Sequence, residues 1–404
     1  MKKLLAIAVI FALVTGAAFA ETAIGGVVET RFSAQGSNAS GDAGKPTLGG
    51  GVGDAYLQLS GENDDGTFGG LLRLNSISPH DRPQLDTPLQ DEHGNNITHV
   101  VASLSHHRAF IWWRPIDQLQ IFLGQDPDGK FSLGDGVTDW AFHRGGSGYI
   151  NYHNWDYWRI VFPGNWDSFG LCISLYPIEG LELNFILPTG GGFLLEDIAG
   201  HFRFQGSFEI QDIGKIMFSY AGPGMSLDAV AAAGHSGVIG GAFRLTAIDG
   251  LTAQLGVSTY LAKDSNVSNK PLFIGLFADY NAGDWGVKFR GAMDMGGFVN
   301  GRPDQGGWRY GNNTNVFAKG NAFQFNIMPY YNMEIMSICF DFGLRIQMLE
   351  SGADTVTYWH ANPYFKMPIP GGEFRGGLKI DNNASTVATD VISWSIPLAF
   401  VFNF

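Results

Sequence analysis

Few residues of this chain are arranged for metal binding or catalysis. The run Asp126-Pro127-Asp128-Gly129 begins like a calcium loop, but Lys130 replaces the next oxygen ligand and no Glu follows at the required spacing. His106 and His107 are adjacent in a segment with a strand pattern, where neighbouring side chains point to opposite faces, so they cannot hold one ion. Neither a G-x-S-x-G nor an H-E-x-x-H motif is present. We therefore predict no catalytic residues, no metal and no cofactor.

Aromatic side chains gather between residues 140 and 166. The gathering consists of Trp140, Phe142, Tyr149, Tyr152, Trp155, Tyr157, Trp158 and Trp166. Aromatic faces carry a negative quadrupole that pairs with the polarised C–H faces of a sugar. We take Trp140, Tyr149, Tyr152, Trp155 and Trp158 as candidate sugar-stacking residues. The alternative is that they pack this segment against the rest of the protein.

Charged residues form two further groups. The segment 126–167 carries the acids Asp126, Asp128, Asp135, Asp139, Asp156 and Asp167. Arginines occupy the polar positions of alternating segments elsewhere: Arg31, Arg73, Arg203, Arg244, Arg290, Arg345 and Arg375. The simplest interpretation of any single one is a solvated side chain without a special role.

The elements that must position these residues are β-strands, and the last one is the clearest. In 390–404 one face holds only apolar side chains, namely Ile392, Trp394, Ile396, Leu398, Phe400, Phe402 and Phe404. The other face is small and partly polar, which is the period-two pattern of a strand. Other segments alternate in the same way and place charges at the centre of the polar face, as Arg290 does in 285–296.

Those central charges decide between a membrane barrel and a soluble fold. An Arg or Lys facing lipid at mid-strand costs about 2–4 kcal/mol, and water inside a wide barrel removes that penalty. A secreted sandwich or propeller is the structural alternative, but it would have loops of more even length.

We predict eighteen strands, with sixteen as the alternative count. The expected ranges are 23–33, 53–61, 67–77, 104–114, 118–125, 168–176, 181–188, 198–211, 213–221, 235–247, 251–261, 271–280, 285–296, 321–331, 335–349, 354–367, 372–382 and 390–404. Tight turns with Pro, Asp and Gly join alternate pairs, as at 115–119, 177–181, 247–251 and 368–372.

The start of the chain and its composition agree with export. Residues 1–20 have the positive start, short apolar core and Ala18-Phe19-Ala20 site of a cleaved signal peptide. No later run of eighteen apolar residues exists, so a membrane span would have to be a closed barrel. The net charge of −13 argues against nucleic acid as a partner. Cys172 and Cys339 fall in separate strands, and we expect two small wall residues, with pairing left open.

The terminal aromatic strand and the rhythm of hairpins resemble the bacterial outer-membrane porins, over residues 21–404. The short Ile-Asp/Glu-Gly-Leu turns resemble those of porin-like proteins of spirochaetes. The resemblance implies an all-β transmembrane antiparallel barrel in the outer membrane that passes small hydrophilic solutes by passive diffusion. It also implies a homotrimer surrounded by outer-membrane lipids, and a barrel-assembly machinery that reads Phe404.

The same resemblance implies that the loop 126–167 folds inward and narrows the channel. Its carboxylates Asp126, Asp128, Asp135 and Asp139 would then face the seven arginines across a constriction, with a mild preference for cations. Two other functions stay open. One is a sugar-selective, maltoporin-like channel that uses the loop aromatics. The other is a surface adhesin or receptor that uses the loops 34–52, 77–103 and 298–320.

Overall fold

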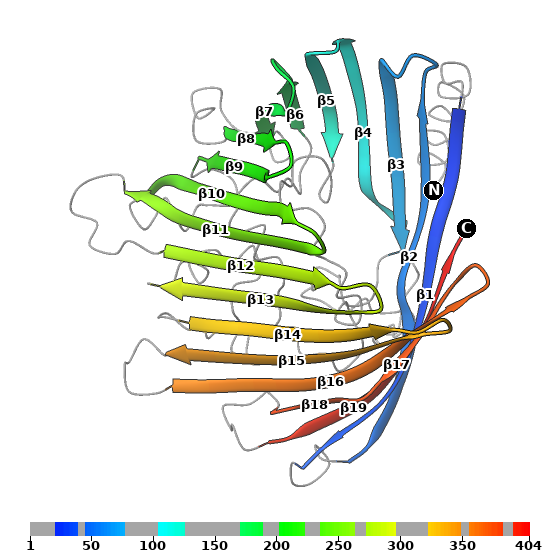
Figure 1. Cartoon of the computed structure of the whole chain (residues 1–404). Helices are drawn as coiled ribbons and strands as arrows, with labels where there is room; N and C mark the ends of the chain where they lie inside the picture. The colour runs from blue at the N-terminus through cyan, green and yellow to red at the C-terminus, as the bar shows by residue number, and fades with distance from the viewer. Residues whose placement is uncertain are drawn as a thin grey trace, which may run out of the picture.

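A computed structural model describes residues 21–38, 45–76, 104–125, 170–188, 202–222, 235–262, 272–295, 322–348, 355–382 and 391–404. All regular elements in these ranges are strands of a single antiparallel sheet (Figure 1). They are β1 (Glu21–Ser37), β2 (Thr47–Glu62), β3 (Phe68–Ser76), β4 (Leu104–Ile116), β5 (Leu119–Gln125), β6 (Gly170–Leu175), β7 (Leu181–Pro188), β8 (Arg203–Ile210), β9 (Gly214–Ala221), β10 (His235–Ile248), β11 (Leu251–Ala262), β12 (Leu272–Asn281), β13 (Trp285–Met295), β14 (Ala322–Asn332), β15 (Ser337–Met348), β16 (Thr355–Ile369), β17 (Gly372–Gly377), β18 (Lys379–Asp381) and β19 (Ser393–Asn403). No helix in the described part is long and apolar enough to cross a membrane.

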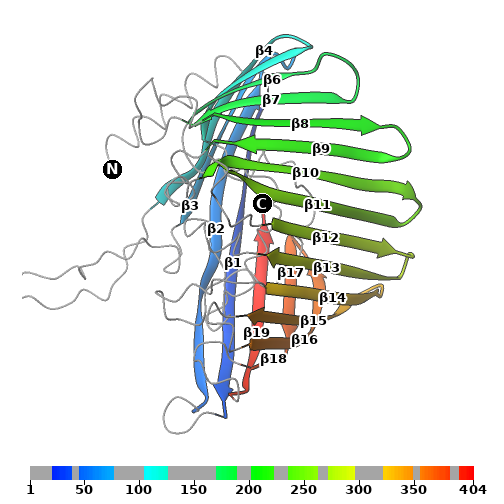
Figure 2. The same ribbon diagram turned by 90° about the vertical axis from the view of Figure 1, so that its left-hand side faces the viewer.

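The sheet closes on itself because β1 pairs with both β2 and β19. Every other strand pairs with its neighbours in the chain, so sequential hairpins run around the barrel. Figures 1 and 2 show the blue start and the red end of the chain lying side by side at the closure. A closed barrel leaves no strand edge with unpaired backbone groups.

The segments β17 and β18 are one barrel strand interrupted at Leu378. Tyr364 pairs with Gly377 before the interruption and Ala361 with Ile380 after it, so the register against β16 does not shift. The backbone N–H of Leu378 still donates to the Pro363 carbonyl at 2.9 Å. The barrel therefore has 18 strands, which confirms the predicted number and the predicted strand at 372–382.

Short turns lie at one end of the barrel, and the predicted tight turns are among them. The β10–β11 turn consists of Asp249 and Gly250, and Gly250 has a φ of 72°, a left-handed conformation that glycine adopts without strain. The β16–β17 turn likewise uses Gly371, with a φ of 74°. We call this end the short-turn end.

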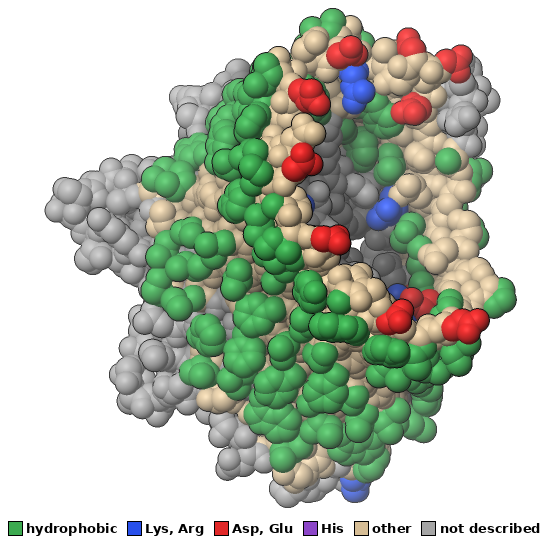
Figure 3. Space-filling model, viewed as in Figure 1, with side chains coloured by type: hydrophobic (Ala, Val, Ile, Leu, Met, Phe, Trp, Pro, Cys, Tyr) green, Lys and Arg blue, Asp and Glu red, His purple; other side chains and the backbone are tan. Residues whose placement is uncertain are grey.

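The two faces of the wall differ as the alternation predicts. In β19, Phe400 and Phe402 are each 43% exposed on the outside, whereas Ala399 and Val401 are buried on the inside. Hydrophobic side chains cover the outer wall in Figure 3. Cys172 on β6 and Cys339 on β15 are both buried and are not joined by a disulfide, so they are separate wall residues.

Candidate functional site

The inward face of the barrel carries five of the seven arginines singled out in the sequence. Arg203 and Arg290 are nearly buried, on the face opposite to exposed Phe208 and Met293. The register places Arg73, Arg244 and Arg375 on the same inner face. Arg31 and Arg345 lie in β1 and β15, but their side chains fall outside the described part.

The acids predicted to face these arginines fall outside the described residues, namely Asp126, Asp128, Asp135 and Asp139. The aromatic residues between 140 and 166, which we predicted to stack on sugars, fall outside them too. The constriction and the row of sugar-stacking aromatic residues therefore stay predictions.

Several wall arginines contact polar partners on neighbouring strands. The guanidinium of Arg73 donates to Gln58 Oε1 at 2.7 and 3.0 Å and lies 4.2 Å above the Tyr56 ring. Arg244 Nε donates to Gln254 Oε1 at 2.8 Å. Planar contacts of this kind fix the direction of a guanidinium, so these charges are held in place along the inner wall.

A buried polar cluster spans β14, β15 and β16. Asn326 Nδ2 donates to Asp341 Oδ1 at 2.9 Å, and His360 Nε2 lies 3.1 Å from Asp341 Oδ2. All three side chains are fully buried. Gly343 leaves the space that the His360 ring occupies, because a Cβ there would collide with the ring. An ion pair joins Lys379 Nζ and Asp381 Oδ2 at 3.1 Å on adjoining β18.

The inner wall also carries an aromatic patch that we did not predict. Phe110, Trp112 and Phe122 face inward from β4 and β5, with ring centroids 5.5–6.4 Å apart. Gly69 on β3 makes room for the Trp112 indole. The alternation of the sequence could have revealed this patch. Phe110 and Trp112 lie on the same strand face as Arg114, and not on the face of the outward-facing apolar residues.

Exposed carboxylates surround the short-turn end. Seven of the eight short turns carry them: Asp64, Asp65, Asp117, Glu179, Asp212, Asp249, Asp284 and Glu334. These turns contain no Lys or Arg. Figure 3 shows Asp and Glu side chains around a hollow at this end, with Lys and Arg side chains inside it. We call these eight residues the acidic rim.

Asp65 and Tyr176, which both lie in short turns, have shifted pKa values. The Thr67 hydroxyl donates to Asp65 at 2.7 Å and lowers the pKa of that carboxyl. Burial, together with the nearby Glu182 carboxylate, raises the pKa of Tyr176 to about 12. The Tyr176 hydroxyl donates to Gln120 Oε1 at 3.3 Å. Among the described residues no group of three or more His, Cys, Asp or Glu side chains is placed to hold a metal ion.

The barrel shares its fold with several solved structures over most of its length. OpdK of Pseudomonas aeruginosa, solved with vanillate, gives a TM-score of 0.51 at 8% identity, covering 94% of this chain and 99% of that chain. The anion-selective porin from Comamonas acidovorans gives 0.50 at 13% identity, with 95% and 99% covered. The fold is that of the bacterial outer-membrane porins.

OmpF of Salmonella typhi, solved in complex with daunomycin, matches the same porin fold. Its TM-score is 0.50 at 12% identity, covering 95% of this chain and 97% of that chain. No protein-family model matches the chain, and no curated protein matches its sequence. At such identities the likeness concerns the fold alone.

Proposed function

We propose that the chain forms a water-filled channel across an outer membrane, through which small hydrophilic solutes diffuse passively with a mild preference for cations. One observation carries this proposal: a closed 18-strand barrel has an apolar exterior and a charged interior. Hydrocarbon suits the first surface and water suits the second. Barrels of sixteen or more strands are wide enough to leave an aqueous channel.

The acidic rim supports the preference for cations. Rings of Asp and Glu side chains at a mouth raise the local concentration of cations and repel anions. The inner wall is mixed rather than acidic, because Arg244, Arg290 and Arg375 lie on it. The preference is therefore expected to be modest.

The constriction belongs to the same proposal. We infer that Asp126, Asp128, Asp135 and Asp139 in the loop 126–167 stand across the bore from Arg31, Arg73, Arg203, Arg244, Arg290, Arg345 and Arg375. Five of these arginines project inward from the described wall, which supports their half of the arrangement.

The cellular location and the oligomeric state of the protein belong to the same proposal. The chain would be exported by residues 1–20, inserted by the barrel-assembly machinery through Phe404, and embedded in outer-membrane lipid. A homotrimer is the assembly we propose, since closed symmetry and an apolar outer wall permit it.

A second candidate is a channel selective for sugars or other solutes with a flat apolar face. The half-buried rings of Phe110 and Trp112 on the inner wall favour it, whereas Phe122 is buried against them. OpdK, a barrel of the same fold, was solved with the aromatic acid vanillate.

Liposome swelling separates these functions. Vesicles containing the protein should swell in polyols and sugars at rates that fall smoothly with solute size, if the channel is general. Selective uptake of sugars over smaller polyols would favour the second candidate, and no swelling at all would favour a surface adhesin.

A further inference from the structure

Exposed isoleucines lie beside the acidic rim at the short-turn end. Five of the eight short turns contain or adjoin one that is at least 46% exposed, and we call these residues the isoleucine collar: Ile116, Ile178, Ile213, Ile248 and Ile335. Each is the direct neighbour in the sequence of a carboxylate of the acidic rim. Large apolar side chains that stay exposed together, bordered by polar residues, mark a contact with another protein or with a membrane.

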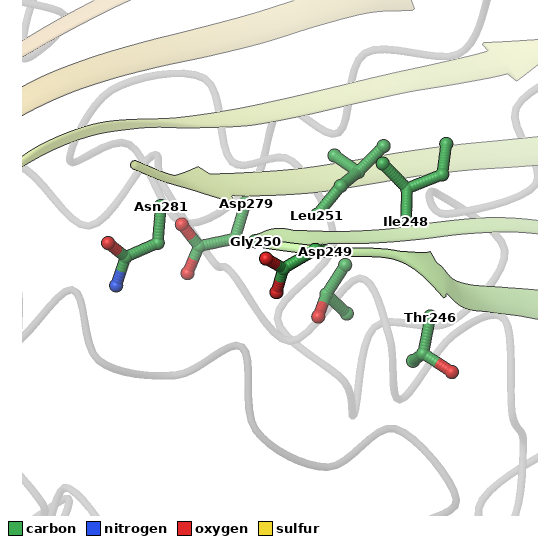
Figure 4. A pocket seen from close by; sticks show the side chains of 8 residues that line it. Thr246, Ile248, Asp249, Gly250, Leu251, Asp279 and Asn281 are labelled. Atoms are coloured by element: carbon green, nitrogen blue, oxygen red, sulfur yellow. The ribbon is translucent and has the colours of Figure 1, made fainter. Parts of the chain in front are cut away.

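The β10–β11 hairpin directs its isoleucine to the outer face of the wall. Ile248 stands opposite Leu251 in the register, and directly opposed residues share one face of a sheet. Leu251 lies on the same strand face as Leu255, which is 51% exposed on the outer wall. Figure 4 shows Ile248 and Leu251 on one side of the strands and the Asp249 carboxylate on the other. The aliphatic pair therefore faces outward, while the carboxylate of the next residue faces the mouth of the barrel.

A shift in register produces this orientation. One extra residue enters β10 between Leu245 and Ile248. Without it, Ile248 would lie on the strand face of Arg244, toward the inner wall. β4 contains the same one-residue shift between Trp113 and Ile116. Two hairpins thus turn outward an isoleucine that simple alternation would direct into the bore.

The collar follows the end of the barrel over consecutive hairpins. It occupies the four hairpins from β4 to β11, and Ile335 continues it in the β14–β15 turn. The β12–β13 hairpin between them carries exposed Tyr280 and Trp285, whose ring centroids lie 5.7 Å apart. Tyr and Trp side chains prefer the boundary between lipid and water. An apolar band is therefore continuous over six hairpins and borders the apolar outer wall.

We propose that the isoleucine collar lies in the hydrocarbon edge of a phospholipid leaflet, so that the membrane at this end reaches the turns themselves. A band that follows the outer wall over six hairpins suits a medium that surrounds the barrel, whereas a protein partner would cover one side. The carboxylates are one residue away, so the change from hydrocarbon to water takes place within about 3–4 Å of chain. This inference rests on the proposed position of the barrel in a membrane, and it adds where that membrane ends.

The test is spin-label electron paramagnetic resonance of the full-length protein in phosphatidylcholine vesicles. Ile116→Cys, Ile178→Cys and Ile248→Cys are each labelled with a nitroxide. The collisions of the label with oxygen, which concentrates in lipid, are compared with its collisions with a water-soluble nickel chelate. We expect oxygen to collide several-fold more often than nickel at all three positions. The parent protein is the blank, because its two native cysteines are buried.

The neighbouring carboxylates provide the matched controls. Asp117→Cys, Glu179→Cys and Asp249→Cys each place the label one residue away in the same turn. Nickel should collide with these labels several-fold more often than with the labels of the collar. Equal access of nickel to both sets would overturn the proposal, because the turns would then stand in bulk water. Protection of the collar from both reagents would also overturn it, in favour of a contact with another protein.

Leu255→Cys separates a failure of this inference from a failure of the proposed function. Leu255 lies four residues along β11 from Leu251 on the same outer face, which is about 13 Å further into the wall. Nickel at the collar but not at position 255 would keep the barrel in the membrane and contradict only the position of its boundary. Nickel at position 255 as well would contradict the membrane location itself.

Discussion

Gly26 and Phe404 exchange both of their backbone hydrogen bonds. Gly26 N donates to Phe404 O at 2.9 Å, and Phe404 N donates to Gly26 O at 3.1 Å. The Phe404 ring lies on the outer face above Gly26, where a Cβ at position 26 would collide with it. The last residue of the chain therefore completes the β1–β19 closure of the barrel, while its side chain stays 67% exposed.

This arrangement separates the stability of the barrel from its assembly in cells. Phe404→Ala keeps both backbone bonds and removes only an exposed ring. We expect the purified variant to refold in detergent with unchanged heat-modifiable mobility on gels, because closure is intact. In cells we expect several-fold less folded barrel, because the proposed assembly signal is lost.

Phe402→Ala is the control, since Phe402 lies on the same outer face with 43% exposure but is not the terminal residue. It should assemble normally in cells. Equal loss in both variants would mean that the terminal ring has no special role in assembly.

The contact between Gly343 and His360 should be sensitive to a single methyl group. A Cβ at position 343 would lie 2.7 Å from His360 Nδ1 and 2.9 Å from Asn326 Nδ2, both inside the buried polar cluster. Gly343→Ala should therefore displace the ring and lower the free energy of unfolding by about 1–3 kcal/mol, the usual cost of overpacking. Urea unfolding followed by tryptophan fluorescence measures this change.

Gly241→Ala provides the comparison, because a Cβ there meets only Met217 O at 3.7 Å. That is ordinary van der Waals contact. If the two variants unfold at the same urea concentration, the His360 ring is not packed as described.

Tyr176 should make the barrel sensitive to alkaline pH. Its folded pKa of about 12 exceeds the ordinary value near 10, chiefly through burial. The unfolded chain therefore ionises first, and stability is lost as the pH rises from about 10 to about 12. Phenolate absorbance of the folded protein should lose its component near pH 12 in Tyr176→Phe. Persistence of that component in the variant would assign the shift to another tyrosine.

The acidic rim should set the ion preference. Replacing Asp117, Glu179 and Glu334 together by their amides removes three exposed charges from the mouth. We expect the reversal potential in a salt gradient to move toward the anion side, with the size of the conductance step within about twofold of the parent. Asp135→Asn with Asp139→Asn should shift it further if the loop 126–167 lies in the bore. An unchanged reversal potential in the rim variant would mean that the acidic rim does not set the ion preference.

Alternation in the sequence was sufficient to predict the strands and the face of the wall on which their side chains lie. The apolar stripe from Ile392 to Phe404 lies outside, and Arg203 and Arg290 lie inside, as predicted. β2 begins earlier than predicted, at Thr47, because Gly49, Gly50 and Gly51 have no side chains with which to show a period.

Contacts between strands could not be predicted in the same way. Asn326, Asp341 and His360 meet only because three strands adopt one register, and alternation identifies a face but not the neighbour across it. The pairing of β10 with β11 likewise shifts register between Leu245 and Ile248. Sequence periodicity does not reveal such a shift.

Single-channel recording in a planar lipid bilayer tests the central claim most directly. The purified protein should insert with current steps of a defined size, and a salt gradient should give a reversal potential on the cation side. An absence of steps, with the protein shown to be folded and inserted, would contradict a water-filled bore, and an anion-side potential would contradict the role given to the acidic rim.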